Sequence, residues 1–407
     1  MADAIHLIAN EPLAGNVPPA SVMTLDTTAG SIIHYCFSRL GQVGLAQTFT
    51  LFKSYIIAVA LTYLPLLIAA AFSPLSIAVP AEGHHLPFLY DLNVCFMFLV
   101  SFPCLIILTI TDQQALVGAL RSVQSDGTIT IPHEDAKRLA VRWHARFRRT
   151  NLAGQWLGVV AGITIAYFNF VTYTPAPVGF WIAHEGHLLP IGFVFLYCIF
   201  LFYAVIPIYV LRNIAISLLL KDIVAHSQLH LLPLHPDRCG GLRPVGRLGL
   251  RNQYALTLLG LNIVLLIVIS RRYLDVPDSV NGLIVAAVIA YVFLGPVVFM
   301  APLLPFRAGM LKTKSQLMSE VAQRLRVELD RMRVQLASGA ISKEDDELIE
   351  RLRKIGAVID ELPVWPFDAG TLRKFLTAYI IPLVSGVGYP VLKIVLDFAK
   401  IEIPAIK

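Results

Sequence analysis

Residues 188–211, LLPIGFVFLYCIFLFYAVIPIYVL, contain no Asp, Glu, Lys, Arg or His. A bilayer core about 30 Å thick needs roughly 20 apolar residues in a helix, so this stretch is long enough to span a membrane. Five further stretches, of roughly 17–24 residues, also lack charge. The six predicted spans are Ser54–Ser73, Leu92–Thr111, Leu152–Tyr173, Leu188–Leu211, Tyr254–Ser270 and Asn281–Leu304.

The composition of the chain agrees with an all-α, multi-spanning membrane protein. Of its 407 residues, 56% are hydrophobic and 15% are charged, whereas a soluble domain has about 25% charged residues. None of the five cysteines falls in a predicted outer loop, so no disulfide framework is expected. The six runs carry no ionisable side chain, which argues against an ion-coupled transporter or a proton pump.

The distribution of Lys and Arg predicts the orientation. Connections with many Lys and Arg residues alternate with connections that have few or none, and the positive-inside rule puts the basic ones in the cytoplasm. The chain then divides into a cytoplasmic N-terminal segment, a six-helix membrane domain with two basic cytoplasmic loops, a cytoplasmic helical hairpin, and a last membrane segment with its tail. Their residues are 1–53, 54–304 with loops 112–151 and 212–253, 305–374, and 375–407.

A seventh membrane segment is predicted at Phe375–Leu396, which is interrupted by Pro382, Pro390 and Lys393. It either crosses the bilayer, giving seven spans, or enters and returns. Crossing is favoured, with Lys393 extending toward the interface, while Lys400 and Lys407 in the tail argue for a cytoplasmic C-terminus. The sequence Trp365-Pro366-Phe367 before it is typical of an aromatic anchor at the membrane interface.

The loop 112–151 is expected to be structured. Asp112–Val123 should continue span two as a helix, Thr128–Ile131 should form a short extended piece, and Pro132 should begin a basic helix. In that helix Leu139, Trp143 and Phe147 recur every four residues among cationic side chains. A juxtamembrane helix that follows the topology rules is the simpler interpretation, and contact with lipid headgroups is the functional one. The residues concerned are Lys137, Arg138, Arg142, Arg146, Arg148 and Arg149.

Residues 311–362 carry two heptad-like apolar seams separated by Ser338-Gly339-Ala340, which predicts a helical hairpin with coiled-coil character. The hairpin could close on itself, assemble between subunits of a homo-oligomer, or bind a soluble partner. Thirteen basic and eleven acidic residues across 305–374 nearly balance. This balance is typical of a solvated helical surface and argues against a nucleic-acid partner.

The first two predicted hairpins share a motif, which suggests an internal repeat. Glu82-Gly83-His84-His85-Leu86-Pro87 resembles Glu185-Gly186-His187-Leu188-Leu189-Pro190 at a fixed offset. A true repeat would gather these turns at one outer mouth, as a plain loop, a metal site or a pH sensor. The candidate residues are Glu82, His84, His85, His184, Glu185 and His187.

The string His235-Pro236-Asp237-Arg238-Cys239-Gly240-Gly241-Leu242 follows span four. One interpretation is a polar turn, in which Asp237 accepts backbone N–H donors and the glycines allow a sharp bend. The other is a divalent-metal site, because the residue types suit zinc. Its candidate ligands are His226, His230, His235, Asp237 and Cys239.

This string also resembles a His-Pro-Asp-x-x-Gly-Gly-Leu loop found in uncharacterised bacterial polytopic membrane proteins. The resemblance implies a protein of the bacterial inner membrane and brings no activity with it.

Three functions follow from these patterns. The first is a non-enzymatic, oligomeric channel or permeability effector gated from the cytoplasm, because uncharged spans suit a pore that opens by wetting. The second is a metal-dependent enzyme at the His-Pro-Asp loop. The third is a pH- or metal-sensing signalling protein. Gly-x-Ser-x-Gly, phosphate-loop and kinase signatures are missing from the sequence, which favours a non-enzymatic protein.

Overall fold

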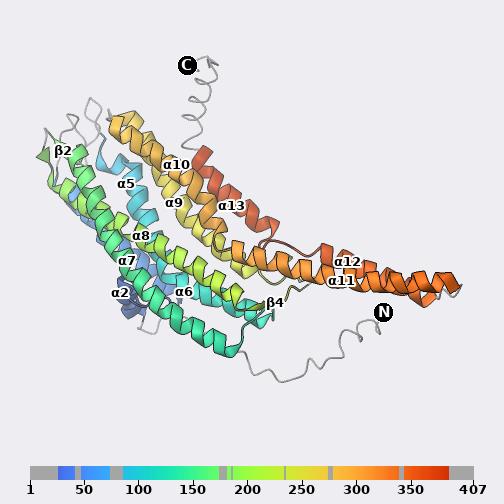
Figure 1. The fold of residues 1–407 in the computed structure, drawn as a ribbon. Coiled ribbons are helices and arrows are strands. Elements are labelled where there is room, and N and C mark those ends of the chain that lie inside the picture. The colour runs from blue at the N-terminus through green and yellow to red at the C-terminus, as the bar shows by residue number, and fades with distance from the viewer. Residues whose placement is uncertain are drawn as a thin grey trace, which may run out of the picture.

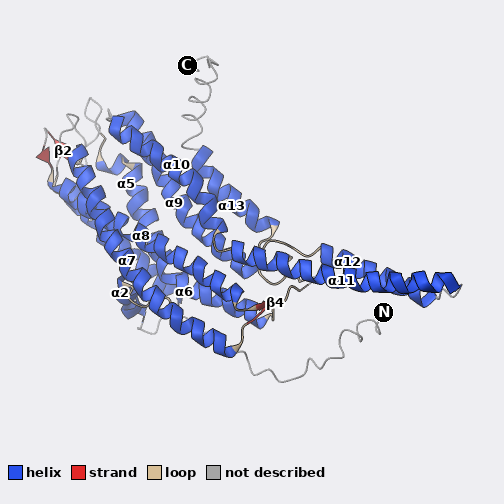
Figure 2. Ribbon diagram, in the orientation of Figure 1, coloured by secondary structure: helices blue, strands red, loops and turns tan. Residues whose placement is uncertain are grey.

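The computed structural model is built almost entirely of helices, with two very short antiparallel strand pairs (Figures 1 and 2). It describes residues 26–41, 47–73, 86–173, 181–184, 187–232, 235–273, 278–338 and 343–384.

The N-terminal half contains α2 (Ile32–Gly41), α3 (Gln47–Ala71), η1 (Phe88–Tyr90), α5 (Leu92–Phe96), the π-helical η2 (Met97–Ser101), α6 (Phe102–Ser125), β1 (Ile129–Thr130) and α7 (His133–Tyr173). The C-terminal half contains β2 (Ala183–His184), β3 (His187–Leu188), α8 (Pro190–Ala225), β4 (Gln228–Leu229), α9 (Arg243–Tyr273), α10 (Asp278–Met300), α11 (Leu304–Ser338), α12 (Lys343–Asp360) and α13 (Ala369–Pro382).

Five described helical segments are long and apolar enough to cross a bilayer, which confirms the predicted α-helical membrane class. They are Leu51–Ala71, Leu92–Ser125, His133–Tyr173, Pro190–Ala225 and Arg243–Ile269. A sixth is added if α10 and α11, which meet at 46°, are counted as one bent span. The seventh span stays a prediction, because residues 385–407 lie outside the described residues.

The helices continue well beyond the charge-free runs. The expected helical extension of span two, the short extended piece and the basic helix after Pro132 are all present, as the end of α6, β1 and the start of α7. The extended piece is paired, because Ile129 lies opposite Leu229 of β4. The predicted loops 112–151 and 212–253 are therefore largely helical, and they lengthen the bundle at the end marked by β4 in Figure 1.

Among the described residues, most buried apolar side chains belong to two clusters. The first, which we call the span core, lies around Phe98, Trp181 and Phe202. The second, which we call the base core, lies around Trp143 and Phe306. In Figure 1 the end of the bundle that carries β2 is opposite the end that carries β4. Span-core and base-core residues succeed one another along α6, α8 and α9, so the two cores are stacked along the bundle.

Three glycines bring α7 and α8 into backbone contact. Gly154, Gly158 and Gly162 recur every four residues on one face of α7 and are buried. A Cβ on Gly158 would lie 2.2 Å from the carbonyl oxygen of Ala204 on α8. This is the small-residue packing that membrane helices use to approach closely.

Helices α11 and α12 lie side by side and project away from the bundle (Figure 1). Their expected apolar seam is only partly covered. Leu352 is buried, whereas Leu311 and Leu329 are 43% and 49% exposed. The described residues therefore give no support to a closed coiled coil.

Helix α13 packs along α9 and α10. Its Tyr379 donates a hydrogen bond to the carbonyl of Val292 at 2.7 Å, and its Phe375 stacks on Phe299 with ring centroids 4.2 Å apart. Just before it, Trp365 lies under the guanidinium of Arg307, 4.1 Å from the ring centroid. The expected aromatic anchor is thus packed against protein in the structure.

Candidate functional site

A buried ion cluster joins three of the long helices. Arg212 of α8 lies 3.1 Å from Asp112 of α6, measured from Nε to Oδ2. Arg251 of α9 lies 3.6 Å from the other carboxylate oxygen of Asp112. The side chains of Arg212 and Asp112 are 0% and 4% exposed. Buried charges of this kind within a membrane protein are rare and mark functional sites by default.

The charges of the cluster lie just outside the six charge-free runs. The runs Leu92–Thr111 and Leu188–Leu211 end one residue before Asp112 and Arg212. Because α6 and α8 continue without a break, these boundary charges lie inside the bundle instead of at its surface. They form a polar layer between the span core and the base core.

Arg251 and its neighbour also make hydrogen bonds across the helices. Arg251 donates from Nη2 to the carbonyl of Leu108 at 2.6 Å and to the hydroxyl of Thr111. Beside it, the hydroxyl of Tyr209 donates to Asn252 at 3.3 Å. Two guanidinium groups thus face one carboxylate, so the layer carries an excess of positive charge.

The segment before and within α2 closes one side of this layer. Arg212 donates to the hydroxyl of Thr27 at 3.0 Å, and its other terminal nitrogen lies 3.4 Å from Nδ1 of His34. Burial, together with the charge of Arg212, lowers the pKa of His34 to about 4, so this imidazole is neutral at physiological pH.

Asn151 of α7 fixes that segment in place. Its side-chain amide is buried and donates to the carbonyls of Thr27 and Ala29 at 3.1 and 2.8 Å. One turn further along α7, Gln155 donates to the carbonyl of Gly30 at 2.7 Å. We call residues 26–36 the plug segment. Sequence reasoning placed it in an undivided N-terminal tail and missed its role beside the cluster.

The His-Pro-Asp loop is a polar turn, as its structural interpretation expects. Asp237 accepts backbone N–H groups from Cys239, Gly241 and Arg243 at 2.8, 3.1 and 3.2 Å. Burial alone would raise the pKa of this carboxyl, but the three N–H donors and His235 outweigh it, and the pKa lies below its usual value. Asp237 therefore organises the turn that leads into α9.

Gly241 shows why the turn needs glycine. Its φ is +92°, and a Cβ would lie 2.1 Å from the hydroxyl of Thr128, which precedes β1. The loop thus packs directly against the β1–β4 pair. Cys239 is buried in the same turn, and this burial, with the nearby Asp237, raises the pKa of its thiol to about 12.

The predicted metal ligands at this loop do not converge. Nδ1 of His226 is 2.8 Å from the carbonyl oxygen of Asp222. Nε2 of His230 is 3.3 Å from the hydroxyl of Thr130. Within the part of the chain that the structure describes, no three His, Cys, Asp or Glu side chains are grouped to hold a metal ion. The candidate set His226, His230, His235, Asp237 and Cys239 therefore has no geometric support as a metal site.

Most of the second predicted cluster lies outside the described residues, namely Glu82, His84, His85 and Glu185. His184 and His187 are opposite each other in the β2–β3 pair. The internal repeat and the outer metal or pH site stay predictions.

The basic helix packs on protein through its apolar stripe. Leu139, Trp143 and Phe147 are buried in the base core, and Trp143 donates to Asp222 of α8 at 3.1 Å. The stripe is therefore not available to a lipid surface. The six basic side chains expected to contact headgroups, Lys137, Arg138, Arg142, Arg146, Arg148 and Arg149, are all exposed.

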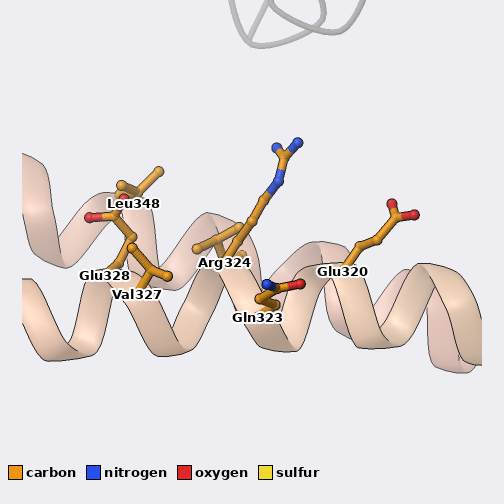
Figure 3. Close-up of a pocket in the computed structure, with 7 residues that line it drawn as sticks. Glu320, Gln323, Arg324, Val327, Glu328 and Leu348 are labelled. Atoms are coloured by element: carbon orange, nitrogen blue, oxygen red, sulfur yellow. The ribbon is translucent and has the colours of Figure 1, made fainter.

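A shallow groove of about 510 Å³ lies between α11 and α12. Figure 3 shows Glu320 and Arg324 extending from α11, with Leu348 contributed by α12. Its lining mixes charges of both signs with a few aliphatic side chains, which is typical of a solvated surface. It offers no convergent polar groups comparable to the ion cluster.

No protein-family model, curated protein or solved structure matches this chain.

Proposed function

We propose that this chain is a non-enzymatic channel or permeability effector of the bacterial inner membrane, and that the ion cluster and the plug segment hold it closed. The observation that carries the proposal is the position of the cluster. A layer of buried charge, bridging Asp112, Arg212 and Arg251, crosses the bundle between two apolar cores.

The closed state follows from the energetics of these groups. An apolar section such as the span core excludes water and ions until it is wetted. The plug segment covers Arg212, and its hydrogen bonds must break before water reaches the cluster. Once wetted, two guanidinium groups beside one carboxylate would favour anions over cations.

Several finer features belong to the same proposal. The N-terminus, the extended base of the bundle and the α11–α12 hairpin lie in the cytoplasm, as the basic connections predict. The exposed apolar residues of that hairpin, among them Leu329 and Val334, provide a surface for a second copy or a soluble partner. Gating from inside then acts through the base core, which contacts α11 at Met310.

The test is an anion-flux assay in liposomes that compares the wild type with Asn151→Ala. This change removes two hydrogen bonds that hold the plug segment. At about 1 kcal/mol each, their loss should raise the open fraction roughly thirtyfold. Asn169→Ala is the matched control, because Asn169 is on the same helix and its side-chain amide donates to Ile165 of that helix.

Increased flux in Asn151→Ala, with Asn169→Ala unchanged, supports the proposal. Folded protein that passes no anion or cation in either form, at any voltage or pH tried, refutes it. The other two functions have less support. The metal-dependent enzyme lacks a grouped ligand set among the described residues, and the outer sensor rests on turns of which only a part is described.

A further inference from the structure

An apolar groove of about 580 Å³ lies between α8 and α10, with α9 as its floor. Its walls include Ile214, Leu256, Leu294 and Val297. The volume is within the range of roughly 300–1,000 Å³ that is typical of small-molecule sites. It is separate from the α11–α12 groove of Figure 3.

The uncharged polar side chains Tyr209, Asn213 and Ser217 of this groove already have partners within the protein. Tyr209 donates to Asn252, Asn213 donates to the carbonyl of Tyr209 at 3.0 Å, and Ser217 donates to the carbonyl of Asn213 at 2.9 Å. The hydroxyl hydrogens of Tyr209 and Ser217 and one amide hydrogen of Asn213 are therefore not directed at an occupant. The surface that remains is hydrocarbon, which suits an apolar chain better than a polar solute.

The length of the groove matches one leaflet of a bilayer. Along α8 it extends from Tyr209 to Lys221, or about 18 Å at 1.5 Å per residue. Half of a bilayer core is about 15 Å. An acyl chain that enters from the leaflet nearest α11 would fill the groove along its length.

A second cavity of about 650 Å³ continues from the basic end of the first. The two share Lys221 and Pro305 in their linings. The second is more polar than the first, and it is lined by the end of α8, by β4 and by the first turns of α11. Its walls include Lys221, His230, Lys312, Thr313 and Gln316.

The charges of this second cavity favour an anion. Neither Lys221 nor Lys312 forms an ion pair with a carboxylate among the described residues. Glu320 lies at its α11 end and is the acidic member of the lining. Lysines that converge between membrane helices at the bilayer surface are a recognised site for phosphate headgroups.

We propose that the two cavities form one binding site for an anionic phospholipid. An acyl chain occupies the apolar groove, and the phosphate lies between Lys221 and Lys312, with Gln316 as a hydrogen-bond donor. This inference does not rest on the proposed channel, because it follows from the shape and charge of the two cavities alone. The occupied groove would also contact Asn213 and Asn252, the direct neighbours of Arg212 and Arg251.

The experiment is native mass spectrometry of the full chain, released from nanodiscs of phosphatidylcholine and phosphatidylglycerol in equal parts. The wild type should retain one phosphatidylglycerol per chain. Lys221→Gln combined with Lys312→Gln should bind it about thirtyfold more weakly, the factor expected for the loss of two lysines near an anionic surface. Arg326→Gln combined with Arg333→Gln, at two exposed positions of α11 outside both cavities, should bind as the wild type does.

A second variant tests the acyl-chain half of the site. Ala301→Phe places a ring in the apolar groove and should abolish retention while both lysines remain. Inorganic phosphate added in excess should not displace the lipid, because the acyl chain contributes to its binding. Equal retention of phosphatidylcholine, equal loss in the Arg326/Arg333 control, or a second copy of the chain cross-linked into the groove would each overturn the proposal.

Discussion

Replacing Arg212 by Met should sharply destabilise the protein. The change keeps an unbranched side chain but leaves the buried Asp112 with Arg251, whose Nε is 3.6 Å away, as its remaining ionic partner. Removing one member of a buried ion pair costs about 3–5 kcal/mol, because the other charge stays desolvated. We expect Arg212→Met to lower the free energy of unfolding by that amount. The hydrogen bond to Thr27 is lost as well.

The assay is unfolding in mixed micelles, followed by tryptophan fluorescence. Trp143 and Trp181 are buried in the base core and the span core, respectively, so the signal reports on both. The control is Arg146→Met, because the Arg146–Asp222 pair is 53% and 29% exposed and such pairs contribute about 0–1 kcal/mol.

A double-mutant cycle separates the ion pair from simple packing. Adding Asp112→Asn to Arg212→Met removes the stranded charge, so the double variant should lose at least about 2 kcal/mol less than the two single losses combined. If Arg212→Met costs no more than the Arg146 control, or if the single losses add, the cluster is not the buried ion pair argued above.

Three further outcomes are expected. Gly158→Val should cost about 1–3 kcal/mol, because its side chain meets the backbone of α8, whereas Gly118→Val, where a Cβ has no neighbour within 4 Å, should cost far less in the same unfolding assay. In the folded protein at pH 8, maleimide should label the exposed Cys36 and spare the buried Cys239; equal labelling rates would contradict the described turn. Because the folded pKa of Asp237 is depressed, its contribution to stability is complete above about pH 4 and is lost as the pH falls through the folded pKa. In Asp237→Asn, the free energy of unfolding should therefore fall less steeply as the pH is lowered below about 4. The same steepness as in the wild type would show that the pKa of this carboxyl does not differ between the folded and unfolded states.

The membrane-spanning helices could be predicted from the sequence because hydrocarbon imposes a simple condition, a long run without charge. The same condition caused the ion cluster to be overlooked. Asp112 and Arg212 follow directly after such runs, where a charge is normally assigned to the interface. Only the continuation of α6 and α8 into the base core buries them. The sequence does contain one indication of the cluster. Asp112 and Arg212 have opposite charges, and each follows the end of a predicted span on the same side of the membrane.

Other features depended on contacts that no local pattern encodes. The Gly154, Gly158 and Gly162 spacing is visible in the sequence, but its partner on α8 is not. The position of the plug segment depends on the amide of Asn151, which is far away in sequence. The polar role of Asp237 was predictable, because an Asp two to six residues before backbone donors in a glycine turn is a local arrangement.

Helix α7 contains no proline and runs unbroken through 41 residues, or about 60 Å at 1.5 Å per residue. Its apolar half borders α8 through glycines, and its basic half carries Trp143 and Phe147. Such a rod transmits rotation with little loss. A tilt of about 5° around its Tyr173 end would move Arg142 sideways by roughly 4 Å, about the distance between two side chains in contact, so a modest pull at the cationic tip is enough to change which side chains meet across the bundle.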